Sequence, residues 1–282
     1  MEDTIAAIST ALGVGAISII RVSGPESVNI VNKIFDKDLT IAKSHTIHYG
    51  HIIDQNKIID EVLISIMLAP KTFTKEDIIE INCHGGISTT NKVLELLLTN
   101  GARLAEPGEF TKRAFLNGRI DLTEAEGVMN LIEAKSDISR QLSINQLTGS
   151  VSNLIEDLRS DLVSIISNIE VNIDYPEYDD IEVLTNEKIT PSIKKLLSKI
   201  TNILNKSTDG KIIKDGINIG IIGRPNVGKS SLLNALLEEQ KAIVTDIEGT
   251  TRDIVEGRFI LNGIVCNIID TAGIRKTDNL VE

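Results

Sequence analysis

An eight-residue loop, Gly223–Ser230, constrains the fold of this chain more than any other feature of its sequence. It reads Gly-Arg-Pro-Asn-Val-Gly-Lys-Ser, the phosphate-binding pattern Gly-x-x-x-x-Gly-Lys-Ser, between a predicted strand at 217–222 and a predicted helix at 231–237. The glycines let backbone N–H groups converge on phosphate oxygens beside a helix N-terminus. Lys229 supplies charge to the β- and γ-phosphates, and Ser230 supplies a hydroxyl for Mg²⁺. The alternative is a chance glycine-rich turn between a strand and a helix.

Two polar segments downstream extend this prediction. Asp270-Thr271-Ala272-Gly273 follows a predicted buried strand at 264–269, which places a carboxylate to hold Mg²⁺ through water and a glycine N–H to meet a γ-phosphate. The loop Gly249–Asp253 contains Thr250 and Thr251, and a threonine there completes Mg²⁺ coordination only with a triphosphate bound. Such a loop acts as a switch that is released after hydrolysis. The alternative is that both threonines lie in an ordinary solvated turn.

Composition bounds the other function classes. The 282 residues are enough for two or three domains, and with no Trp, three Tyr and five Phe their cores are built from Ile, Leu and Val. Cys83 and Cys266 are too few for a disulfide framework and suit the reducing cytosol, so a cytoplasmic protein is expected. The net charge of −11 argues against a broad basic face for duplex nucleic acid but allows a local basic pocket. No signal peptide and no apolar run of about 18 residues is evident, so no membrane partner is expected.

Apolar periodicity divides the chain into three parts, at 1–117, 118–210 and 211–282. The first part alternates strand-like and helical runs, and two strands joined by a short loop predict a partly antiparallel α+β sheet. The second part predicts long amphipathic helices, broken near Gly149, each with one apolar face that needs a packing partner. The third part returns to short strands around the phosphate-binding loop. The expected strands of the first part are 15–22, 45–53, 57–68 and 77–83, its expected helices are 26–35 and 88–99, and the expected helices of the second part are 121–172 and 186–205.

The motifs described above resemble those of Era-like GTPases of the translation-factor class. Three further stretches carry a closer resemblance, over the whole chain, to the MnmE (TrmE) family of tRNA-modification GTPases. They are Ile20-Arg21-Val22-Ser23-Gly24, Glu80-Ile81-Asn82-Cys83-His84-Gly85-Gly86, and the long stretch Pro107–Leu122. The resemblance implies a combined α/β and α+β multidomain fold. Its parts would be an α+β, tetrahydrofolate-binding and dimerising N-terminal domain, the first half of a helical domain, and the N-terminal part of a P-loop GTPase domain.

The resemblance also implies a function. Members of the family bind and hydrolyse GTP and, together with the flavoprotein MnmG, add an aminomethyl or carboxymethylaminomethyl group to the wobble uridine of certain tRNAs. The expected cofactors are GTP, Mg²⁺, K⁺ and a tetrahydrofolate one-carbon donor, in the 5-formyl or the methylene form. The expected partners are an MnmG-type flavoprotein, tRNA, and a second copy of the chain bound through the N-terminal domain.

Carried over residue by residue, the folate contacts of the family fall on Arg21, Glu80 and Arg119. Arg119 stands where some relatives have Lys, and the two cations present their donors differently. Apart from the resemblance, a strand carboxylate such as Glu80 more often simply faces solvent.

The other site residues that the resemblance implies bind GTP and two cations. Ser230 and Thr251 would ligate Mg²⁺, and Glu282, Lys229 and Thr251 would be catalytic, with Glu282 positioning the attacking water. The expected K⁺ ligands are the Asn226 side chain and the backbone carbonyls of Thr245, Ile247 and Thr250. The expected GTP contacts are Asn226, Val227, Gly228, Lys229, Ser230, Ser231, Thr245, Thr250, Thr251, Asp270, Thr271, Ala272 and Gly273.

The potassium assignment also has a physical motive. Ras-like enzymes orient water with a Gln after the Asp-x-x-Gly motif and offset charge with an arginine finger. Ile274 follows that motif here and can do neither. A monovalent cation held by Asn226 and the switch loop would supply the missing charge.

Cysteine and histidine residues offer weaker candidates. His45, His48 and His51 lie in a predicted strand, where a spacing of three sends side chains to alternating faces, so a zinc site is disfavoured. Cys83 and His84 are strand neighbours that point apart, which disfavours a nucleophile pair.

No Asn-Lys-x-Asp guanine-reading tetrapeptide follows the phosphate-binding loop. We therefore expect a chain truncated within its GTPase domain, which alone binds GTP weakly or not at all, while residues 1–117 fold on their own core. The alternative function is a non-catalytic folate-binding dimerisation fragment or a degenerate paralogue. A generic Era-like ribosome-assembly GTPase is disfavoured by the stretch Pro107–Leu122.

Overall fold

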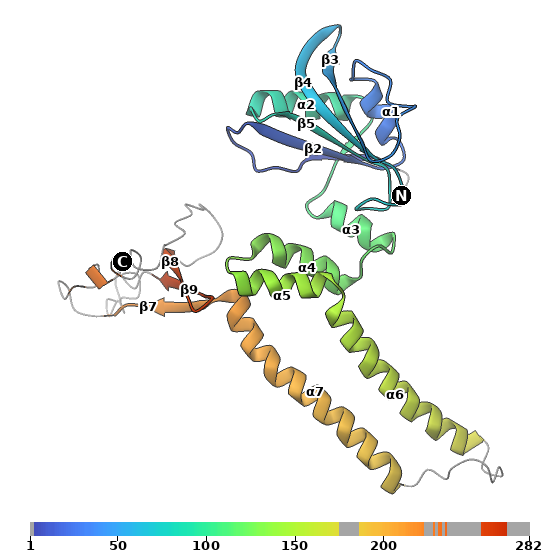
Figure 1. Ribbon diagram of the computed structural model, residues 1–282, viewed down its shortest axis with the longest axis vertical. Helices are drawn as coiled ribbons and strands as arrows, with labels where there is room; N and C mark the ends of the chain where they lie inside the picture. Colours follow the sequence, from blue (N-terminus) through green and yellow to red (C-terminus); the bar gives the residue numbers. More distant parts are fainter. Residues whose placement is uncertain are drawn as a thin grey trace, which may run out of the picture. The chain divides into compact units, whose positions relative to one another are not determined.

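The computed structural model describes residues 3–174, 186–222, 228, 231, 232, 235 and 255–269, and the chain divides into two compact units, 1–125 and 126–282 (Figure 1). The strands are Ile5–Ile8 (β1), Ile17–Ser23 (β2), Thr46–Asp54 (β3), Lys57–Met67 (β4), Ile78–His84 (β5), Arg103–Leu104 (β6), Ile217–Gly220 (β7), Val255–Leu261 (β8) and Ile264–Ile269 (β9). The helices are Ser27–Asn32 (α1), Ile87–Thr99 (α2), Glu109–Leu116 (α3), Leu122–Glu133 (α4), Asp137–Leu147 (α5), Ser150–Asp174 (α6) and Asn186–Asp215 (α7).

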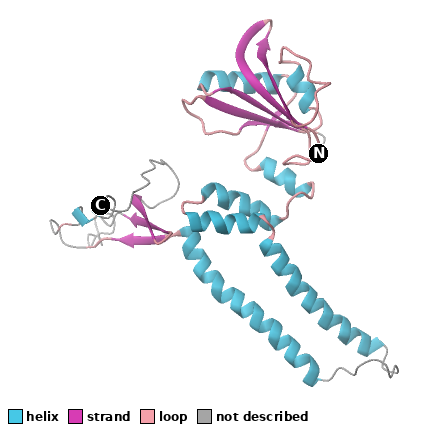
Figure 2. Ribbon diagram, in the orientation of Figure 1, coloured by secondary structure: helices cyan, strands magenta, loops and turns pink. Residues whose placement is uncertain are grey.

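The first unit is built on one sheet in the order β3-β4-β5-β2-β1-β6, antiparallel except for the β1–β6 pair. One face of this sheet packs against α1 and α2 (Figure 2). Because strand side chains alternate between faces, Ile20, Ile64 and Ile81 point into that core and are fully buried. Their neighbours Arg21 and Glu80 therefore point to the other face, where the candidate site lies.

The predicted α+β character of the first unit is confirmed, and so are all four predicted strands, with ends that move by one or two residues. The predicted helices are also present, although α1 is four residues shorter than 26–35. Strands β1 and β6 were not predicted. Both are short strands whose partners lie far away in the sequence. Ile5 of β1, for example, pairs with Ser23 of β2 and with Arg103 of β6.

The second unit begins with helices, as the periodicity predicts. The break near Gly149 is confirmed: this residue has a φ of 79°, which suits glycine, between the end of α5 and the start of α6. A second break, which was not predicted, separates α4 from α5, and there the Ser136 hydroxyl accepts a hydrogen bond from the Ser139 N–H as an N-cap. Helix α7 continues ten residues past its predicted end at Asn205 and stops where Gly216 adopts a φ of 80°.

The second unit also contains a small sheet in the order β7-β9-β8, with β7 and β9 parallel. Its core is formed by Phe259, Cys266 and Ile268. This combination of an α+β unit, long helices and a short parallel pair confirms the expected mixed α/β and α+β fold class. Among the described residues, no helix is both long and apolar enough to cross a membrane.

Candidate functional site

A charged pair marks the open face of the first sheet. Arg21 of β2 lies directly opposite Glu80 of β5, and its Nε and Nη2 atoms both donate to Glu80 Oε1, at 2.8 and 2.6 Å. Both side chains are partly exposed, at 29% and 23%. No described residue makes a hydrogen bond to the other carboxylate oxygen, Glu80 Oε2. The pair thus offers a ligand both a carboxylate oxygen and an ordered guanidinium group.

Two phenylalanines and a second arginine complete the cluster. The Arg21 guanidinium lies 5.8 Å from the ring centroid of Phe73 and 5.7 Å from that of Phe110, within the range of cation–π attraction. The Arg119 guanidinium lies 4.9 Å from the same Phe73 ring. The three residues predicted as folate contacts, Arg21, Glu80 and Arg119, are therefore brought together around Phe73.

Neither phenylalanine was among the predicted site residues. A signal was nonetheless present in the sequence, because the chain has only five Phe and Phe110 lies inside the distinctive stretch Pro107–Leu122. Phe73 lies in the loop between β4 and β5, and nothing in its local pattern indicates a site.

A buried ion-pair cluster holds the elements that carry these side chains. Arg113 of α3 is fully buried and contacts the carboxylates of Asp3, Glu76 and Glu109 at 2.8, 3.2 and 3.1 Å. Arg103 of β6 also binds Glu109, at 2.5 Å. These contacts join the N-terminal segment, the β4–β5 loop and α3. They therefore fix the positions from which Phe73 and Phe110 reach the site.

The charges of this cluster are fixed by their partners. Hydrogen bonding from Arg103, together with bonds from the Glu106 N–H and Arg113, lowers the pKa of the Glu109 carboxyl to about 2 although its burial acts in the opposite direction. The pKa of Asp3 is lowered as well, chiefly by the hydrogen bond from Arg103. Burial alone would lower the pKa of Arg113, but its hydrogen bond to Glu109 and the nearby carboxylates raise it overall. Asp3, Glu109 and Arg113 are thus charged at neutral pH.

A surface pocket of about 400 Å³ adjoins the cluster of arginines and phenylalanines around Arg21. Phe73 and Arg119 belong to both, and the pocket also contains Lys71 and Lys75. The loop that forms it is tied to the end of α3, where Lys75 Nζ donates to the Gly118 carbonyl at 2.9 Å and Asn117 Nδ2 donates to the Thr74 carbonyl at 2.6 Å.

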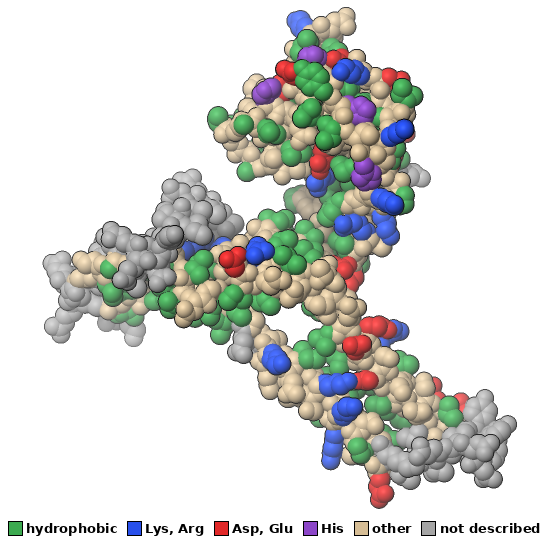
Figure 3. Space-filling model, in the orientation of Figure 1, with side chains coloured by type: hydrophobic (Ala, Val, Ile, Leu, Met, Phe, Trp, Pro, Cys, Tyr) green, Lys and Arg blue, Asp and Glu red, His purple; other side chains and the backbone are tan. Residues whose placement is uncertain are grey.

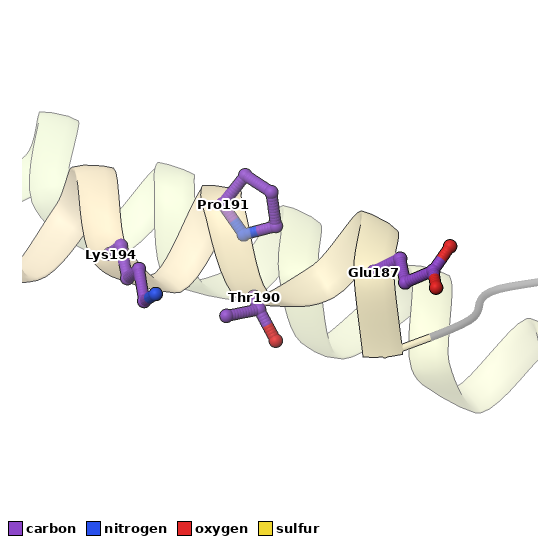
Figure 4. Close-up of a pocket in the computed structure, with 4 residues that line it drawn as sticks. All are labelled: Glu187, Thr190, Pro191 and Lys194. Atoms are coloured by element: carbon purple, nitrogen blue, oxygen red, sulfur yellow. The ribbon is translucent and has the colours of Figure 1, made fainter.

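A second hollow, of about 510 Å³, lies on α7 and is lined by Glu187, Thr190, Pro191 and Lys194. Figure 4 shows that all four side chains come from this one helix at helical spacing. Its lining brings together no reactive or ligating groups from different elements, which is unlike a catalytic or ligand-binding site.

The cysteine and histidine residues do not form a catalytic pair. Cys83 faces the core, its Sγ lies 3.4 Å from the Ser18 carbonyl, and burial raises the pKa of its thiol, which keeps it a neutral and weak nucleophile. His84 points to the open face, as the strand pattern predicts, and its Nδ1 lies 2.6 Å from Asp60 Oδ1. Within the described residues, no group of three or more His, Cys, Asp or Glu is placed to hold a metal ion.

The nucleotide-binding residues fall mostly outside the described part of the chain. That is so for Asn226, Val227, Lys229, Ser230, Thr245, Ile247, Thr250, Thr251, Asp270, Thr271, Ala272, Gly273 and Glu282. Gly228 and Ser231 are described. Gly228 has a φ of 91°, and its carbonyl accepts a hydrogen bond from the Leu232 N–H at 2.9 Å, which is an i to i−4 bond at the start of a helical turn.

The strands that lead into these residues end side by side. In the parallel β7–β9 pair Gly220 lies opposite Ile269, so the chain leaves both strands at the same sheet edge. The phosphate-binding motif begins three residues after Gly220, and Asp270 follows Ile269 directly. This edge, at the carboxyl ends of parallel strands, is where α/β proteins place their ligands.

The chain thus combines an α+β unit, which carries a cluster of arginines and phenylalanines, with long helices and a parallel strand pair. Because this strand pair leads into a P-loop sequence, the chain falls in the class of multidomain P-loop proteins. Residues 4–119 match the sequence family described as GTP-binding protein TrmE N-terminus, and residues 122–278 match the MnmE helical domain. Relatives named tRNA modification GTPase MnmE include those of Bacillus cytotoxicus and Bacillus anthracis, both 59% identical over 283 residues, and of Streptococcus thermophilus, 56% identical over 281 residues.

The chain belongs to the MnmE (TrmE) family. Each of these three alignments covers 99% of this chain and 62% of the relative, so the chain spans less than two thirds of the length of its relatives. The second family match continues through the phosphate-binding motif, and the three-part division at 117 and 210 stays a prediction.

Proposed function

We propose that this protein takes part in GTP-dependent modification of the wobble uridine of tRNA, with a folate one-carbon donor bound by its first unit and GTP bound at the edge of β7 and β9. Membership of a family whose relatives are named tRNA modification GTPases supports the overall activity. The convergence of Arg21, Glu80 and Arg119 around Phe73 is the observation that carries the folate part.

The chemistry of a reduced folate matches this cluster. The pterin ring of a folate presents two adjacent N–H donors in a fork, which is the pattern that a carboxylate such as Glu80 accepts. Aromatic faces at Phe73 and Phe110 would pack against the apolar parts of the ligand. Arg119 would attract the carboxylate end of the molecule.

Calorimetric titration of the chain with 5-formyl-tetrahydrofolate tests the folate site. Glu80→Gln and Arg119→Ala should each weaken binding by about 10- to 100-fold, because each removes a charge-assisted hydrogen bond. The matched controls are Glu95→Gln on α2 and Arg140→Ala on α5, which remove the same charges from exposed ion pairs that share no residue with the site. Equal affinity in all variants, or no binding to the unaltered chain, would remove this part of the proposal.

For the nucleotide site we propose that Lys229, Ser230, Thr251 and Asp270 serve the phosphates and Mg²⁺. The common edge of β7 and β9 supports this placement, since both motifs leave the sheet there. We further propose that Asn226 and the backbone carbonyls of Thr245, Ile247 and Thr250 hold a K⁺ ion, and that Glu282 positions the attacking water.

The rates of GTP hydrolysis in K⁺ and in Na⁺ test the cation site. They are measured on the chain and, where one exists, on the longer protein. Hydrolysis should be faster in K⁺, and Asn226→Ala should abolish that difference while Asn202→Ala, on the exposed surface of α7, preserves it. Equal rates in both salts for the unaltered protein would exclude the potassium mechanism. Folate binding with no hydrolysis by any form would favour the alternative of a non-catalytic folate-binding fragment or degenerate paralogue.

The proposed partners follow from the same family membership. They are an MnmG-type flavoprotein, tRNA, and a second copy of the chain joined through the first unit.

A further inference from the structure

A cationic pocket continues the proposed folate site beyond Arg119. It contains Lys71, Lys75 and Arg119, and its lining includes no acidic residue. Within the described part of the chain none of these three side chains forms an ion pair. Figure 3 shows Lys and Arg side chains gathered over the region of α3, on a molecule whose net charge is −11. A local cluster of unneutralised cations in an acidic protein indicates an anionic ligand.

The acidic residues next to these lysines are already engaged. Glu76 binds Arg113 at 3.2 Å and accepts a hydrogen bond from Ser23 at 2.8 Å. Asp77 accepts the Ala69 N–H at 2.8 Å. Neither belongs to the pocket lining, so the positive charge of the pocket faces outward without a neutralising partner.

We propose that this pocket binds the γ-linked glutamate tail of a polyglutamylated folate. The inference rests on the proposed folate site and specifies which form of the ligand that site prefers. A pterin held at Glu80 and a tail that passes Arg119 would meet Lys71 and Lys75 next, because Phe73 and Arg119 are shared by the cluster and the pocket. Each added glutamate carries one further carboxylate, which these exposed ammonium groups can pair with.

The pocket suits a short flexible acid better than a nucleic acid backbone. A duplex requires phosphate contacts spread along a basic face. Here the cations line a single hollow of about 400 Å³, which lies within the size range of small-ligand sites. Binding of RNA phosphates to these lysines is therefore treated as a competing outcome of the test.

The test compares 5-formyl-tetrahydrofolate carrying one glutamate with the same compound carrying five, by calorimetry on the full 282-residue chain. The pentaglutamate should bind about five- to tenfold more tightly, the gain expected from two or three exposed ion pairs. This ratio should fall as salt is raised from low to physiological concentration. The double variant Lys71→Gln/Lys75→Gln should bring the ratio of the two dissociation constants close to one.

The matched control is Lys33→Gln/Lys57→Gln, which removes the same charge outside the pocket. Lys33 donates to the Asn100 carbonyl much as Lys75 donates to that of Gly118. This control should keep the full ratio. Circular dichroism of both variants checks that they fold.

The outcomes separate the two proposals. If neither compound binds the unaltered chain, the folate proposal itself fails. If both bind equally, or if the Lys71/Lys75 variant retains the ratio, the tail pocket is overturned while the folate site stands. The tail pocket is equally overturned if that variant weakens binding of tRNA while the glutamate ratio persists.

Discussion

At the scale of single residues, Arg113 supports the site without touching it. Its side chain is fully buried, and an isolated guanidinium in that position would cost several kcal/mol. Contacts with Asp3, Glu76 and Glu109 compensate for this cost, and its Nε alone lacks a hydrogen-bond partner. The residue therefore fastens α3 to two segments that are distant in sequence.

Arg113→Leu tests this role. It leaves three carboxylates without their central cation, so the free energy of unfolding should fall by about 3–5 kcal/mol. Urea titration followed by circular dichroism measures it. Arg140→Leu, which removes an exposed arginine with an i,i+3 partner, should change stability by less than about 1 kcal/mol. Similar stability of the two variants would show that the buried cluster contributes little.

Acid should weaken the same cluster through Glu109. Its pKa of about 2 in the folded protein lies below its ordinary value of 4.5, so the ionised form stabilises the fold above about pH 4.5. That contribution is lost as the pH falls from about 4.5 to about 2. The urea midpoint of the unaltered chain should drop across this window, and Glu109→Gln should drop less steeply although it starts from a lower stability. Parallel profiles would contradict the assignment.

At the scale of elements, the sequence predicted those that carry a regular pattern over many residues. The strand of Arg21 and the strand of Glu80 were found in this way, and Gly149 marked a helix break. Strand β1 was not predicted because its four residues, Ile5–Ile8, show no alternation of apolar and polar side chains. Strand β6 was not predicted because it has only two residues. Their pairing depends on partners about 100 residues away, which no local window can contain. For the same reason the three residues proposed to contact folate came from family resemblance, while Phe73, Lys71 and Lys75 were missed.

Close packing of α4 on α5 gives a prediction at this scale. A Cβ atom at Gly127 would lie 3.2 Å from the side chains of Gln146 and Leu147, whereas one at Gly210 in α7 would have no neighbour within 4 Å. Gly127→Val should therefore destabilise the second unit by about 1–3 kcal/mol through overpacking. Gly210→Val should leave it unchanged or slightly more stable, because valine is a better helix former than glycine. Urea unfolding of both variants decides, and equal effects would exclude a tight contact at Gly127.

At the scale of the whole molecule, the chain consists of two units with separate cores. The core of the first unit is formed by residues of β1–β5, α1 and α2, including Val31, Ile81 and Leu97. Its sheet is completed by β6, and its ion-pair cluster by Arg103 and Arg113, all of which precede α4. The contacts that stabilise this unit thus lie within its own residues.

A polypeptide of residues 1–121 should therefore fold alone, with a cooperative urea transition. One of residues 1–100 should not, because it lacks β6, both arginines and α3, and leaves the outer edge of β1 unpaired. Circular dichroism during urea titration distinguishes the two, and calorimetry on the longer polypeptide should give the same affinity for 5-formyl-tetrahydrofolate as the full chain. A cooperative transition with the same midpoint in both polypeptides would show that the C-terminal segment of the unit is dispensable. Folding of the longer polypeptide without folate binding would show instead that the site needs residues beyond position 121.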